Sequence, residues 1–219
     1  MKSQVITIVG MGAGNGMGIA RRFGKEGFVV AMIARSGDKL KKYQKSLQKD
    51  KIESYYFLAD VSDPQSLRDS ISYIYESLGP THVLVYNAAV PRQKPPLSLA
   101  EQELLDDFEI NVVGAMTAIQ AVVPAMKEEG AGKVLITGGG FALEPNPALA
   151  SLSLGKSALR NLTFALHDHL LPHEIHVATV TICGNISPDH EKYAPDAISE
   201  NYWTLYQQER DAWEKEIVY

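Results

Sequence analysis

The chain has 219 residues, of which 45% are hydrophobic and 21% charged, and its formal net charge is −5. This balance is typical of a globular protein with a substantial core, and the lack of a dense Lys/Arg cluster argues against a nucleic-acid surface. The single cysteine, Cys183, excludes an intrachain disulfide and fits a cytoplasmic protein. Because no His/Cys spacing is typical of zinc and no apolar run reaches about eighteen residues, we expect neither a metal site nor a membrane span.

The first apolar run, Val5–Val9, predicts a buried parallel strand, and it leads into the glycine-rich stretch Gly10–Phe23, GMGAGNGMGIARRF. Glycines let the backbone approach a phosphate closely, and the first amides of a helix attract an anion. A loose GxGxxG overlaps a GxxxGxG at Gly12, Gly16 and Gly18, and the second fits without strain. We therefore expect a nucleotide site in which valine at Gly16 or Gly18 would block binding but spare much of the fold. A glycine-rich turn without a ligand is the alternative.

Strands and helices alternate along the rest of the chain. This rhythm implies an α/β fold, a doubly wound parallel sheet with helices on both faces, and strand order 3-2-1-4-5-6-7 in one domain over residues 1–219. Strands are predicted at 28–34, 55–59, 83–86, 133–137, 175–182 and 217–218. Helices are predicted at 38–49, 64–78, from 101 onward with Pro124 near the end, at 151–171 and at 197–213.

Six short motifs on these elements together resemble the short-chain dehydrogenase/reductase family. They are the GxxxGxG turn, Asp60-Val61, Asn87-Ala88-Ala89, Asn111, Lys156 in GKSALR, and Thr181-Ile182-Cys183-Gly184. The resemblance covers nearly the whole chain and implies a Rossmann-type oxidoreductase with Asn111 and Lys156 in the catalytic set. It also implies that the cofactor is held by Gly12, Gly16, Met17, Gly18, Asp60, Val61, Asn87, Lys156 and Gly184.

Two catalytic positions of the family are changed here. The family's tyrosine lies four residues before the lysine, where this chain has Leu152, and its serine falls near Gly139. Leucine neither donates a proton nor binds an oxyanion. The loss of a general acid costs about 10²–10⁴ in rate, and the loss of an oxyanion donor about 10²–10³. Since no tyrosine lies between Tyr86 and Tyr193, none on the same helix replaces it.

The end of the second strand indicates which dinucleotide binds. An NAD enzyme of this fold has an acid there, whereas this chain has Ala34 followed by Arg35 and Ser36. Because an arginine fork pairs with phosphate oxygens, we expect Arg35 to bind a 2′-phosphate, and NADP rather than NAD as cofactor. Asp38, farther along, is expected to cap the next helix.

Each candidate also has a plainer interpretation. Lys156 is alternatively a surface lysine, Asn111 a backbone-bonding residue beside a helix irregularity, and Asp60 an N-cap. We expect Cys183 to be a small buried apolar residue, and Ser151 a helix cap.

The C-terminal segment is rich in aromatic residues, which line a pocket, fill an oligomer interface or pack in the core: Tyr202, Trp203, Tyr206, Trp213 and Tyr219. The resemblance implies that residues of about 185–215 cover a small-molecule substrate, and that paired helices form a homodimer or homotetramer. The sequence thus predicts an NADP-dependent oxidoreductase on a small carbonyl or alcohol with a non-standard proton donor. A catalytically silent cofactor-binding sensor or partner subunit is the alternative.

Overall fold

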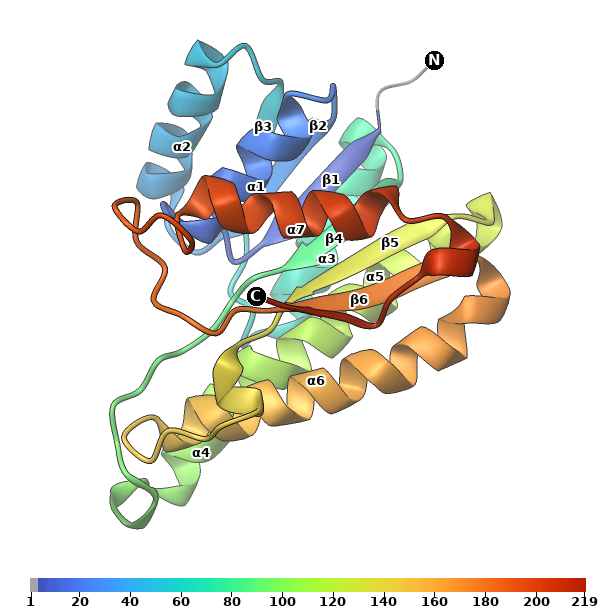
Figure 1. Cartoon of the computed structure of the whole chain (residues 1–219). Helices are drawn as coiled ribbons and strands as arrows, with labels where there is room; N and C mark the ends of the chain where they lie inside the picture. The colour runs from blue at the N-terminus through green and yellow to red at the C-terminus, as the bar shows by residue number, and fades with distance from the viewer. Residues whose placement is uncertain (1–3) are drawn as a thin grey trace.

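The computed structural model describes residues 4–219, and its centre is one sheet of seven strands in the order β3-β2-β1-β4-β5-β6-β7 (Figure 1). Every neighbouring pair is parallel, and all residues of β1 and β6 are buried, as continuous apolar runs predict. The α/β class and the strand order are confirmed. The strands are β1 (Val5–Val9), β2 (Val29–Ala34), β3 (Ser54–Leu58), β4 (Thr81–Tyr86), β5 (Gly132–Thr137), β6 (Ile175–Thr181) and β7 (Glu216–Val218).

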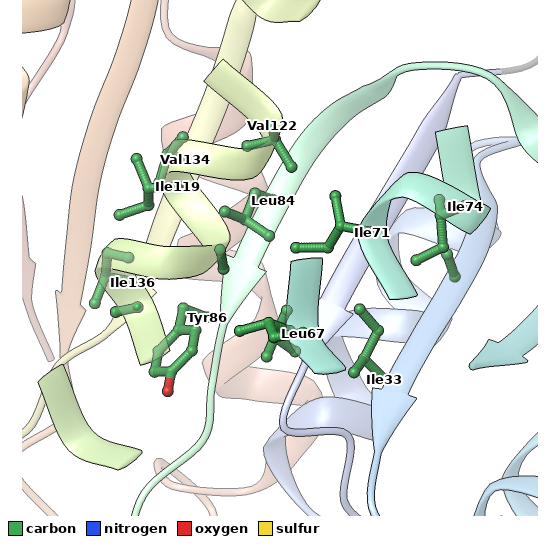
Figure 2. Close-up of a cluster of buried hydrophobic side chains, with 14 of the residues drawn as sticks. Ile33, Leu67, Ile71, Ile74, Leu84, Tyr86, Ile119, Val122, Val134 and Ile136 are labelled. Carbon is green, nitrogen blue, oxygen red and sulfur yellow. The ribbon is translucent and has the colours of Figure 1, made fainter. Parts of the chain in front are cut away.

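Helices cover both faces of the sheet and form two separate hydrophobic clusters with it. One cluster joins α3, α5 and α6 to the strands, and the other joins α1, α2 and α7. Figure 2 shows part of the first cluster, where Ile71 of α3 and Ile119 of α5 pack with Leu84 of β4. The helices are α1 (Asn15–Gly24), α2 (Gly37–Lys49), α3 (Pro64–Leu78), α4 (Glu101–Phe108), α5 (Gly114–Glu129), α6 (Ala150–Leu170) and α7 (Pro195–Gln207).

The single long helix predicted from residue 101 is interrupted. A π-helical turn, Glu109–Val113, separates α4 from α5, while Pro124 lies inside α5. The carbonyl of Ile110 within this turn accepts a hydrogen bond from the buried Tyr86 hydroxyl. The wide turn carries Asn111, so a local irregularity sets the position of a predicted site residue.

By length and composition alone, the stretch Glu101–Glu129 is apolar enough to cross a membrane, with a mean hydropathy of 1.4 in its most apolar window. In the fold this stretch covers the sheet, because Ala115, Ile119 and Val122 belong to the first hydrophobic cluster. Its apolar character is therefore explained by core packing.

Two helix ends differ from the prediction. Ser36 rather than Asp38 caps α2, because its extended backbone aims its hydroxyl at the amide of Lys39. The last helix ends at Gln207 rather than at residue 213, since Gln208 is extended and its carbonyl accepts the indole N–H of Trp213.

Candidate functional site

A cavity of about 990 Å³ lies at the carboxyl ends of β1, β4, β5 and β6. This is the edge at which a doubly wound sheet binds its ligand. The glycine-rich turn forms one side of the cavity, and the start of α6 with the loop before it forms the other. The lining residues are Gly12, Gly14, Asn15, Gly16, Asn87, Ala89, Thr137, Gly138, Gly139, Gly140, Phe141, Leu143, Glu144, Pro145, Asn146, Pro147, Leu152, Lys156, Ile182, Cys183, Gly184, Asn185 and Ile186.

The glycine-rich turn leaves space where a phosphate would bind. A Cβ atom at Gly12 would meet no heavy atom within 4 Å, so this position faces open space in the cavity. Gly10 has a φ of +83°, and a Cβ there would lie 2.4 Å from the amide nitrogen of Ala88, so the turn passes directly against the end of β4. Gly14, the N-cap of α1, has no side chain that could occupy the space in front of the first amides of the helix. These features fit an anionic group at the start of α1.

Gly18 has a different reason to be glycine. A Cβ atom there would lie 2.4 Å from the carbonyl oxygen of Pro195, so Gly18 allows α1 to pack against the start of α7. Valine at this position would therefore disturb the contact between α1 and α7 as well, and its effect on cofactor binding remains a prediction. Gly16 is tight as well, since its Cβ would lie 3.1 Å from Met11 Sδ.

A buried polar network joins the turn to β4, β5 and α7. The Nδ2 group of Asn15 donates to Asn87 Oδ1 at 2.9 Å and to Tyr202 Oη at 3.0 Å. Thr137 Oγ1 donates to Asn87 Oδ1 at 2.9 Å and lies 2.7 Å from Tyr202 Oη. Because the Thr137 hydroxyl proton is donated to Asn87, the Tyr202 hydroxyl must donate to Thr137 Oγ1. Burial raises the pKa of Tyr202 to about 12. Asn15 and Thr137 were missed in the sequence because no motif required them.

One acceptor of this network is unpaired among the described residues. Asn15 Oδ1 is buried and has no hydrogen-bond partner there, although Asn15 lines the cavity. A buried acceptor without a partner is costly, so this oxygen fits a ligand hydroxyl.

Lys156 reaches the cavity from α6 and is 7% exposed, so the surface-lysine alternative is wrong. Its Nζ donates to the carbonyl oxygen of Thr137 at 2.6 Å, and burial lowers its pKa to about 8. Leu152, one turn earlier on α6, lines the same cavity, and among residues 4–219 no tyrosine or serine does so.

Of the three glycines after β5, only Gly139 has room for a side chain. A Cβ there would lie 3.6 Å from the Lys156 side chain, which is ordinary contact. At Gly138 it would lie 2.5 Å from Thr179 Oγ1, and at Gly140 3.0 Å from Cys183 Cα. Gly139 is thus the position at which a cavity hydroxyl would fit.

Ser151 is not a helix cap. Its hydroxyl donates to Asp107 Oδ2 at 2.7 Å, and Arg92 binds the same buried carboxylate with two nitrogens. Ser151 therefore joins α6 to α4 and does not line the cavity.

Asn111 is 2% exposed and does not line the cavity. Its Oδ1 accepts the amide of Val90 at 2.8 Å, beside the π-helical turn, which is the plainer role considered above. Within the described residues its Nδ2 has no partner. A contact between Asn111 and reacting groups remains a prediction.

Arg35 and Asp60 follow β2 and β3 at the same edge of the sheet, outside the cavity lining. Arg35 is exposed, and its Nη1 lies 3.9 Å from Asp60 Oδ2. Asp60 does not cap α3, since Asp63 does; it accepts the amide and hydroxyl of Ser62. Burial raises the pKa of Asp60, but the Ser62 hydrogen bonds and Arg35 lower it further, so it stays below its usual value. The other predicted cofactor residues outside the lining are buried: Met17, Gly18 and Val61.

The segment after β6 differs from the sequence prediction in two respects. Cys183 is exposed and lines the cavity, so the expectation of a small buried residue is wrong. Of the predicted covering segment 185–215, only Asn185 and Ile186 line the cavity. Helix α7 packs against α1 (Figure 1). The half-buried rings of Trp203 and Tyr206 therefore pack against the core, edge-on to Phe23.

Residues 4–219 contain no group of three or more His, Cys, Asp or Glu side chains placed to hold a metal ion.

Known proteins share both the sequence pattern and the fold. The family model for short chain dehydrogenases matches residues 4–198. A 3-dehydrosphinganine reductase of Arabidopsis thaliana is 30% identical over 184 residues, or 82% of this chain and 55% of that protein, so this chain spans about half its length. L-2,3-butanediol dehydrogenase of Corynebacterium glutamicum is 27% identical over 210 residues, or 91% of this chain and 81% of that protein. An alcohol dehydrogenase of Thermococcus sibiricus, solved with 5-hydroxy-NADP, superposes with a TM-score of 0.89 at 25% identity over 99% of this chain and 96% of that one.

Proposed function

Because the chain belongs to the short-chain dehydrogenase/reductase family, we propose that it is an NADP(H)-dependent oxidoreductase acting on a small carbonyl or alcohol with a non-standard proton donor. One part of the cavity carries this proposal, and we call it the cofactor half. It consists of the open glycine turn, the start of α1, and the hydrogen-bonded pair Asn15 and Asn87, which line the same cavity as Lys156. The turn at Gly12 would hold the pyrophosphate, and Asn15 Oδ1 and Lys156 the nearby ribose hydroxyls.

NADP is favoured by the residues after β2 and β3. Arg35 is free to move, being 70% exposed and only loosely paired with Asp60, and no acid takes its place at the end of β2. A 2′-phosphate would pair with its guanidinium fork, while Asp60 would face the adenine side. The Thermococcus enzyme with 5-hydroxy-NADP supports the same choice.

The bound cofactor would supply hydride. The chain itself would orient the substrate and keep water from the reacting carbon, because side chains such as Phe141, Leu152 and Ile182 form an apolar wall opposite the turn. Asn111, held by Val90, would stabilise the loop that carries Ala89 into the cavity.

A silent cofactor-binding sensor or partner subunit is the second candidate, and Leu152 and Gly139 favour it, since neither supplies a donor. Consumption of NADPH by the purified protein with aldehydes, ketones and activated alkenes separates the two. Turnover with any of them supports the oxidoreductase, whereas tight NADPH binding without turnover supports the silent protein.

We also propose that residues 1–219 form one domain and that the protein is a homodimer or homotetramer. We further propose that it is located in the cytoplasm. Exposed apolar side chains on the α4–α6 face, Leu105, Val113 and Leu154, support pairing through that face. Light scattering coupled to gel filtration would give the mass, and a Leu154→Arg variant that stays oligomeric would contradict this interface.

A further inference from the structure

Among the described residues 4–219, three ionisable side chains line the cavity, and they differ in how exposed they are. Glu144, on the loop before α6, and Cys183, after β6, are both exposed. Lys156 is buried, and its aliphatic chain runs beside Gly139. Only Lys156 therefore combines a cavity position with shielding from bulk water.

We propose that Lys156 is itself the proton donor of the reaction, its ammonium protonating the substrate oxygen directly. This inference rests on the proposed oxidoreductase function and names the donor that Leu152 cannot be. An ammonium has three N–H groups, and in the described structure Thr137 O is the only hydrogen-bond partner of Lys156 Nζ. Two N–H groups thus remain, one for a ribose hydroxyl of the cofactor and one for the substrate oxygen.

The surroundings of Lys156 favour release of its proton. Burial lowers its pKa to about 8, close to the operating range of a general acid, and no charged partner offsets this effect. The Asp107 carboxylate of α4 is bound by Arg92 and Ser151. Tyr202 of α7 reaches the side chain of Thr137, whose carbonyl binds Lys156.

In the direction of reduction, the bound cofactor would supply a hydride that forms the C–H bond at the carbonyl carbon, and the π electron pair of the C=O bond would move to oxygen. An N–H bond of Lys156 breaks as that oxygen takes the proton. The products are the alcohol, the oxidised cofactor and a neutral Lys156 amine, which water in the open cavity reprotonates.

The test is single-turnover NADPH oxidation with 4-nitrobenzaldehyde as the probe, followed between pH 6 and pH 10. Because the charged ammonium is required, the rate should be flat at low pH and fall as pH rises through about 8. Lys156→Arg keeps a charge and donors but holds its proton far above this range, so its rate at pH 7 should fall at least about 100-fold. The controls Glu144→Gln and Cys183→Ser should leave the midpoint of the fall where it is.

A second measurement does not depend on turnover. The Nζ resonance of Lys156 in protein labelled with ¹⁵N-lysine, assigned by its loss in Lys156→Arg, should titrate near pH 8. Three results would overturn the assignment. They are titration of Lys156 Nζ near the ordinary lysine pKa of about 10.4, a shift in the midpoint of the pH–rate profile in either control, and a wild-type rate in Lys156→Arg. If the rate of NADPH oxidation is the same in Lys156→Arg as in the wild type, this inference alone is overturned. If NADPH binds but no carbonyl is turned over, both the oxidoreductase proposal and proton donation by Lys156 are contradicted.

Discussion

The two halves of the cavity depend on different parts of the chain: one on the backbone and the other on single side chains. The cofactor half, built from the glycine turn and the end of β4, keeps the features that its motif requires. The catalytic half, built from the end of β5 and the start of α6, is lined by Gly139 and Leu152, which the sequence analysis predicts to stand at the family's donor positions. One half works through backbone shape and the other through single side chains, so binding can be retained while the usual chemistry is lost.

Packing explains part of this difference. Gly10 and Gly18 contact the backbone of Ala88 and Pro195 so closely that any side chain would displace an element of the fold. No such constraint acts on Gly139, which has room for a hydroxyl. The fold therefore protects much of the cofactor turn but leaves the catalytic positions free to change.

The largest expected effect is a loss of NADPH affinity in a variant that alters the cofactor half but keeps the fold. Gly12→Val places its side chain in open space within the cavity, so it should weaken NADPH binding at least about 100-fold, or about 2.8 kcal/mol. Calorimetric titration gives the affinity, and thermal unfolding should stay close to that of the wild type. Gly18→Val is the matched contrast: it should lower the unfolding temperature because of Pro195. Near-native NADPH affinity in a folded Gly12→Val protein would show that the turn is not the phosphate site.

A smaller effect tests the choice of dinucleotide. Arg35→Ala should weaken NADPH binding about tenfold and leave NADH binding nearly unchanged, because only NADPH carries the 2′-phosphate. Fluorescence titration with both cofactors measures the ratio. Arg210→Ala, which removes an arginine paired with Glu174, serves as the control and should change neither affinity. An unchanged preference in Arg35→Ala would remove the argument for NADP.

The smallest effect concerns the network behind the turn. Tyr202→Phe removes the hydroxyl between Asn15 and Thr137, which should lower the free energy of unfolding by about 1 kcal/mol and weaken NADPH binding a few-fold. Denaturant unfolding and calorimetry measure the two changes. Tyr206→Phe, whose hydroxyl bonds Gln4 at the surface, should change both much less. Equal effects of the two variants would show that the network does not support the cofactor half.

The sequence predicted the sheet order because continuous apolar strands and glycine turns are local signals. It identified Lys156 and Leu152 through the resemblance to the family, whose tyrosine lies four residues before its lysine. It missed the role of Gly18, because the contact with Pro195 joins residues far apart in the chain. The packing of the α7 aromatics against the core also depends on how α7 lies against α1, which no local pattern encodes.

The most direct test of the account restores the missing donors to the intact scaffold. Single-turnover NADPH oxidation is measured with a panel of simple ketones for the wild type, Leu152→Tyr, and Leu152→Tyr combined with Gly139→Ser. The account predicts a slow wild type, a modest gain in the single variant, and a larger gain in the double variant, up to about 10²-fold, because a general acid and an oxyanion donor are regained. Fast wild-type turnover of an ordinary ketone, or a folded, NADPH-bound double variant with no gain, would contradict it.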